Sequence, residues 1–222
     1  MAVSQKKVWN QIAYDKEFTT PLHLELIEPY LHKNSSILDV GCGYGRTLNE
    51  LYKNGYTELF GIDFSEKMIE RAQQQFPFLN VKVQQQQEID FPNNSFDAVF
   101  LFAVLTCIIE NEAQLFLLKE IKRVLKPKGI IYVNDFLLNT DERNKKRYNE
   151  SYEKYKTYGI FTLPEGLVLR HHTLDWVEKS LQLFQCLSFQ TTTFPTMNGN
   201  RSNAYFFIGK NIHFFLVLVV FY

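Results

Sequence analysis

The strongest constraint on the fold is a turn with three glycines at alternate positions, which lies between an apolar run and a helical pattern. It occupies residues 37–51, with the sequence ILDVGCGYGRTLNEL. An apolar run that leads through a tight turn into helical spacing predicts a buried strand, a loop and a helix. Gly41, Gly43 and Gly45 let the backbone pass close to a ligand, and the first amides of the helix suit an anionic group. The stretch therefore predicts a site for a nucleotide-like cofactor.

The spacing of these glycines helps to choose between cofactors. A P-loop requires G-x-x-x-x-G-K-[ST], and no Lys-Ser or Lys-Thr pair follows the glycines, which disfavours a nucleoside triphosphate. The dinucleotide fingerprint is G-x-G-x-x-G, whereas the third glycine here comes one residue earlier. Asp39 stands at the strand end, where a carboxylate can bond loop amides and hold the turn in shape. The run from Asp39 to Gly45, DVGCGYG, resembles the first motif of class I S-adenosylmethionine-dependent methyltransferases.

Later segments extend the resemblance over roughly residues 37 to 137. Residues 58–65, ELFGIDFS, predict a second strand that ends in an acid about 20 residues after the glycines, the spacing that places a carboxylate on a ribose. Asp63 is therefore the expected ribose ligand. Residues 91–100 and 121–133 resemble the family's turn into the fourth strand and its helix, turn and fifth strand.

The order of periodic segments predicts an α/β fold. Strand patterns at 37–40, 58–63, 79–83, 96–103 and 129–136 alternate with helical patterns at 45–53, 65–75 and 112–125. Such alternation implies right-handed crossovers and a mostly parallel sheet with helices on both faces. Residues 183–193 and 202–209, joined across an Asn-Gly turn signal, predict a closing hairpin. The resemblance implies a Rossmann-like, seven-stranded sheet of order 3-2-1-4-5-7-6 with the last strand antiparallel and the ligand at its carboxyl edge.

The length and composition favour one domain with appended segments. The chain has 222 residues, of which 45% are hydrophobic, enough for one substantial core. We expect a single methyltransferase domain over 1–210, with an N-terminal helical cap over 1–32, a lid-like insertion over 139–170 and an apolar tail over 211–222. The stretch 213–222, HFFLVLVVFY, is too short to span a bilayer, so no transmembrane segment is expected.

The resemblance implies that the cofactor is S-adenosylmethionine and indicates which residues hold it. Gly41, Gly43 and Gly45 would admit the methionine portion, Asp63 the ribose, and Phe64 with Met68 the adenine. Gln85 stands where the family commonly has an acid, and its carbonyl can still accept a bond from the adenine amino group. Tyr14 would contact the cofactor from the N-terminal segment, unless the aromatic residues there only pack on the sheet. The full set is Tyr14, Asp39, Gly41, Gly43, Gly45, Asp63, Phe64, Met68, Gln85, Gln86 and Phe102.

Charge and cysteine content narrow the partners. With Lys+Arg 24 and Asp+Glu 24, the formal net charge is +0, so no global field attracts nucleic acid or an acidic membrane. The three cysteines are widely spaced and fit neither a disulfide framework nor a zinc site, and we expect no metal. The first residues lack a signal-peptide pattern, so the default location is cytoplasmic. Basic and tyrosine residues interleave over 143–158 and could bind an anionic or aromatic substrate or form a solvated lid.

The resulting prediction is methyl transfer from S-adenosylmethionine to a small-molecule acceptor. No catalytic residue is identified, although His171 or His172 could act as a base if the acceptor is a hydroxyl. Three alternatives stay open: an NAD-dependent oxidoreductase, a non-catalytic cofactor-binding or partner-binding module, and a methyltransferase that acts on protein or RNA.

Overall fold

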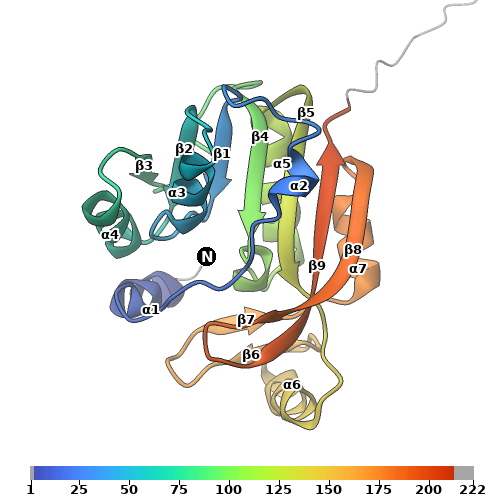
Figure 1. The fold of residues 1–222 in the computed structure, drawn as a ribbon. Helices are drawn as coiled ribbons and strands as arrows, with labels where there is room; N and C mark the ends of the chain where they lie inside the picture. Colours follow the sequence, from blue (N-terminus) through green and yellow to red (C-terminus); the bar gives the residue numbers. More distant parts are fainter. Residues whose placement is uncertain (1–2, 213–222) are drawn as a thin grey trace, which may run out of the picture.

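A seven-stranded sheet forms the centre of the computed structural model, which describes residues 3–212 (Figure 1). Its order is β3-β2-β1-β4-β5-β9-β8, in which β5 pairs antiparallel with β9, and β9 antiparallel with β8. The predicted topology is confirmed, with β8 and β9 as the sixth and seventh strands of the main sheet. The strands are β1 (Ile37–Val40), β2 (Leu59–Asp63), β3 (Asn80–Val83), β4 (Phe96–Phe102), β5 (Leu125–Phe136), β8 (Gln185–Pro195) and β9 (Arg201–Lys210).

Helices cover both faces of the sheet because the central strands are apolar on both sides. In β1, Ile37 packs in the cluster that includes Leu48 and Ile69, whereas its neighbour Leu38 packs with Leu118 on the opposite face. This alternation places α2 (Leu24–Ile27), α3 (Arg46–Lys53) and α4 (Glu66–Gln75) on one face and α5 (Asn111–Val124) and α7 (Leu174–Leu181) on the other.

The insertion after β5 forms a small unit of its own beside the carboxyl edge. It contains α6 (Glu142–Tyr155) and a two-stranded antiparallel sheet of β6 (Ile160–Thr162) and β7 (Val168–Arg170). Figure 1 shows these elements together below the main sheet. A 3₁₀ turn, η1 (Leu105–Cys107), follows β4 and faces β7, where the Thr106 hydroxyl donates to the Arg170 carbonyl at 2.8 Å.

The N-terminal segment is less helical than the sequence predicted. Only α1 (Val3–Ile12) and the single turn of α2 are helical between residues 3 and 32. Arg71 on α4 explains the early end of α1, because its Nη1 donates to the carbonyls of Ala13 and Lys16, both at 2.8 Å. These bonds hold residues 13–20 as an extended strap across the carboxyl edge of the sheet.

Two further expectations concern a transmembrane segment and the apolar C-terminal stretch. Within residues 3–212, every helix is too short or too polar to cross a membrane. The apolar stretch 213–222 lies outside the described residues.

Candidate functional site

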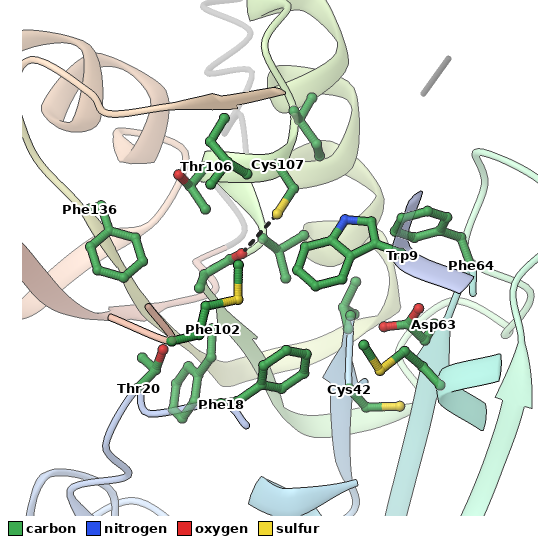
Figure 2. A pocket seen from close by; sticks show the side chains of 18 of the residues that line it. Trp9, Phe18, Thr20, Cys42, Asp63, Phe64, Phe102, Thr106, Cys107 and Phe136 are labelled. Atoms are coloured by element: carbon green, nitrogen blue, oxygen red, sulfur yellow. Dashed lines mark hydrogen bonds between the residues drawn. The ribbon is translucent and has the colours of Figure 1, made fainter. Parts of the chain in front are cut away.

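A cavity of about 510 Å³ lies at the carboxyl edge of the sheet, within the size range of small-molecule sites. The ends of β1, β2, β4 and β5 form its floor, and α1, the strap, the β8–β9 tip and the insertion cover it. Figure 2 shows side chains from these separate parts of the chain converging on one space. The residues that line it include Trp9, Phe18, Asp39, Gly41, Arg46, Asp63, Phe64, Met68, Gln85, Gln86, Phe102, Thr106, Phe136, Arg147 and His171.

The glycine turn is held by Asp63, on the neighbouring strand. Asp63 Oδ2 accepts from the Gly43 amide at 2.9 Å, and its Oδ1 accepts from the Ser65 amide at 2.8 Å. Asp39 was expected to bond the loop amides, but its carboxylate makes no hydrogen bond to any residue between 3 and 212. Asp63 therefore shapes the turn, and Asp39 lines the cavity with its oxygens uncommitted.

The three glycines have different surroundings. All have positive φ, at 73° for Gly41, 53° for Gly43 and 80° for Gly45, which explains the residue type in this turn. Gly41 borders the cavity, whereas the ring of Phe18 covers Gly43, and a Cβ at Gly45 would lie 3.0 Å from Leu79 Cδ1. Of the three, Gly41 alone lines the cavity, and Gly43 and Gly45 pack against Phe18 and Leu79, so cofactor contact at the latter two stays a prediction.

Burial makes the carboxylates at this end of the cavity easy to protonate. Burial raises the pKa of Asp39 to about 8; the Arg46 guanidinium opposes this rise, and the charge of Asp63 adds to it. Burial also raises the pKa of Asp63 to about 6, although hydrogen bonds from the backbone amides of Ser65, Gly43 and Phe64 lower it. The free protein at neutral pH thus holds Asp39 mostly as the neutral acid, and a cation bound beside it would favour ionisation.

Arg46 gives the same end of the cavity an unused donor. It is the first residue of α3, directly after the last glycine, and it forms an ion pair with Glu50 at 3.5 Å and a hydrogen bond to the Thr20 carbonyl. Its Nε is buried and has no partner among residues 3–212. With Asp39 and Arg46, this end can receive a group that carries both an ammonium and a carboxylate.

Flat and flexible side chains surround the region near Asp63. Figure 2 shows Trp9 and Phe64 close to Asp63, and Met68, Gln85 and Gln86 also line the cavity. Tyr14 does not line it, since α1 ends at Ile12 and the side chain turns to the surface, where it is 50% exposed and its hydroxyl bonds Gln74 at 3.5 Å. Trp9 supplies the aromatic cover that the sequence had assigned to Tyr14.

Lys16 joins three of the covering segments to one another. Its Nζ contacts Glu165 of the insertion at 2.9 Å and donates to Asn198 Oδ1 of the β8–β9 tip at 2.6 Å. Three residues further along the strap, the Thr19 hydroxyl donates to the Pro195 carbonyl at 2.6 Å. These contacts join the strap, the insertion and the β8–β9 tip into a roof that covers part of the cavity.

The two candidate histidines are separated by the structure. His171 lines the cavity, and its Nδ1 lies 2.6 Å from the Tyr148 hydroxyl. His172 does not line the cavity: it is buried with its Nε2 2.9 Å from Gln114 Nε2. Burial lowers the pKa of both, to about 3 for His172, so both are neutral at neutral pH.

Phe18, Thr106 and Arg46 were not identified from the sequence as site residues. A signal existed for Arg46, because it follows the last glycine and begins the helix. Thr106 also had a signal, because it lies shortly after the fourth strand, where the family resemblance places residues between cofactor and substrate. None existed for Phe18, which reaches the cavity through contacts between distant parts of the chain. Among residues 3–212 there is no cluster of three or more His, Cys, Asp or Glu arranged to hold a metal ion.

Comparison with known proteins agrees with this geometry. Residues 38–133 match the family model for a methyltransferase domain. A tRNA U34 carboxymethyltransferase of Aliarcobacter butzleri is 25% identical over 202 residues, which cover 87% of this chain and 62% of that protein. A phosphoethanolamine N-methyltransferase of Plasmodium falciparum is 27% identical over 139 residues, covering 61% of this chain and 51% of that protein. The chain thus spans less than two thirds of the length of either relative.

A solved structure resembles this fold over most of the length of both chains. A SAM-dependent methyltransferase from Methanosarcina mazei superposes with a TM-score of 0.81 at 27% identity, covering 86% of this chain and 98% of that one. The glycine turn and the two acids at the ends of β1 and β2 lie within residues 38–133, which the family model matches. Residues 38–133 therefore form a methyltransferase domain, and the fold around them is the Rossmann-like fold of class I S-adenosylmethionine-dependent methyltransferases.

Proposed function

We propose that this protein transfers the methyl group of S-adenosylmethionine to a small-molecule acceptor inside the cavity. The observation that carries the proposal is the cover over part of the cavity, in which Lys16 ties the strap to both the insertion and the β8–β9 tip. A cavity of about 510 Å³ with this partial cover is of a size that suits a small molecule, which supports a small-molecule acceptor over a folded RNA or protein surface.

The residues present fit the cofactor. Asp39 has free oxygens for the ammonium of its methionine portion, and the unpartnered Nε of Arg46 is available for the carboxylate. Asp63 accepts hydrogen bonds from two backbone amides and still has free lone pairs that can accept from the ribose hydroxyls. Phe64, Met68, Gln85 and Gln86, with Trp9 in place of Tyr14, would surround the adenine.

The chain's contribution to the reaction is positioning and exclusion of water. When bound, S-adenosylmethionine supplies a methyl carbon made electrophilic by its sulfonium. Phe102 and Thr106 lie between the glycine turn and the insertion, where they can fix the direction from which an acceptor approaches. The roof removes water from that path, and such alignment supplies much of the rate enhancement in reactions of this kind. No residue is assigned as a base, and His171 is neutral at neutral pH.

Labelled cofactor tests both the activity and the class of acceptor. The protein is incubated with S-adenosylmethionine carrying a radioactive methyl group and a cell extract that is afterwards separated into metabolites, protein and RNA. We expect label in the metabolite fraction, and none with the Asp63→Ala variant. Label mainly in RNA or protein would contradict the small-molecule proposal. Calorimetry that shows binding of NAD and none of S-adenosylmethionine would overturn the cofactor.

A further inference from the structure

An unpaired guanidinium lies at the end of the cavity away from the glycine turn. Arg147 on α6 lines the cavity and forms no ion pair with any residue between 3 and 212. Its Nε is buried without a partner in the same range. The guanidinium carbon lies 3.4 Å from the centre of the Phe161 ring, so the ring holds the group in place. A ring face attracts the cation without using its N–H donors, and Tyr148 beside it shares one hydrogen bond with the guanidinium.

The charges around Arg147 do not neutralise it. Arg143, one turn earlier on α6, also lines the cavity, and its Nε is 3.8 Å from Asp141. The carboxylates that line the cavity are Asp39 and Asp63, and both stand at the opposite end, at the glycine turn. Burial is the main reason that the pKa of Arg147 is lowered; Tyr148 and Asp141 oppose the shift, and the charge of Arg143 adds to it. The insertion therefore presents one uncompensated positive charge to the cavity.

The walls next to this charge are apolar. Phe136, Phe161, Leu163 and Leu169 line the same part of the cavity, and His171 contributes a neutral ring that stacks on Phe136. A molecule that fills this space meets the guanidinium of Arg147, with Arg143 one turn away beside Asp141, and otherwise mostly hydrocarbon and aromatic surface. Such a set of surfaces is complementary to a small organic acid with an apolar body.

From this arrangement we infer that the methyl acceptor is a small carboxylic acid, whose carboxylate pairs with Arg147 and whose apolar body lies against Phe136 and Phe161. The inference rests on the proposed function, because it names the acceptor class for the same cavity. Arg143 already lies beside Asp141, so one negative charge on the ligand is enough to balance Arg147. A carboxylate carries one negative charge, whereas a phosphate monoester carries close to two. The planar guanidinium also matches the two oxygens of a carboxylate.

Binding of matched acids and amides tests the inference. Acetate, benzoate and indole-3-acetate, each with its neutral amide, are titrated by calorimetry into the protein with and without saturating S-adenosylhomocysteine. We expect at least one acid to bind tenfold or more tightly than its amide, and Arg147→Gln to reduce that ratio below twofold. Arg147→Lys should keep part of the preference. Lys146→Gln, which removes one charge from the exposed side of the same helix, should leave the ratio unchanged.

The inference would be overturned if acetate, benzoate and indole-3-acetate each bound no more tightly than its amide. It would also be overturned if Arg147→Gln kept the preference for the acid, or if phenyl phosphate bound tenfold more tightly than benzoate. Circular dichroism and unchanged S-adenosylhomocysteine affinity in the variants show that they fold. Failure of the proposed function has a different signature, since wild-type protein would then bind no S-adenosylhomocysteine. The titrations without that compound still compare acid with amide in this case.

Discussion

Trp9 and Tyr14 lie five positions apart near the start of the chain and differ in their access to the cavity. Trp9 is 9% exposed and lines the cavity, with its ring edge-on to Phe18 at 6.0 Å between centroids. Tyr14 is 50% exposed and touches the cavity nowhere. The pair therefore separates an aromatic residue that lines the cavity from a surface aromatic on the same segment.

Replacing each of the two residues by alanine tests this assignment. Trp9→Ala should weaken S-adenosylhomocysteine binding by about tenfold, since aromatic contacts contribute roughly 1 kcal/mol beyond the area they bury. Tyr14→Ala should change the affinity by less than about twofold, because surface substitutions away from a site have small effects. Calorimetry at one temperature measures both. Equal losses in the two variants would contradict the placement of the binding region.

At the level of elements, the strap over residues 13–20 is the part that local patterns could not predict. The strands and helices of the sheet followed from hydrophobic periodicity, and Asp39 and Asp63 followed from their positions at strand ends. The strap instead depends on Arg71, which is 58 residues from Ala13 in sequence. The covering of Gly43 by Phe18 is likewise a contact between distant segments. Periodicity carries no information on such contacts, which is why Trp9 was passed over for Tyr14 and why Gly43 was expected to border the ligand.

The roof depends on Lys16, and its removal should loosen three segments together. Lys16→Met keeps the length and apolar stem of the side chain but loses the contacts to Glu165 and Asn198. We expect faster amide hydrogen exchange in the strap and in residues 195–200, because both segments lose a shared anchor. We also expect faster dissociation of S-adenosylhomocysteine, measured by stopped flow. Lys7→Met, at an exposed position of α1, serves as the control and should change neither rate.

For the whole molecule, buried carboxyl groups link stability to pH. Burial holds the pKa of Asp39 at about 8 and that of Asp135 at about 7, whereas an aspartate in an unfolded chain ionises near 3.9. At pH 7 the unfolded chain has already released both protons, whereas the folded protein keeps most of the Asp39 proton and about half of the Asp135 proton. The stability that they contribute is fully present below pH of about 4 and is lost as the pH rises through the folded pKa values. His171 and His172 are neutral in both states above pH 7 and do not offset this loss.

The free energy of unfolding should therefore fall between pH 7.0 and 8.5, by about 1 kcal/mol from Asp39 and by a smaller amount from Asp135. Urea denaturation at the two pH values measures the fall. Asp39→Asn should remove most of it, whereas Asp90→Asn, whose side chain is 90% exposed, should leave it intact. If the proposed cofactor site is correct, the ammonium of S-adenosylhomocysteine stabilises ionised Asp39, so the compound should stabilise wild-type protein more at pH 8.5 than at pH 7.0. A fall of equal size in wild type and Asp39→Asn would show that this carboxyl group is not the one that keeps its proton in the folded protein.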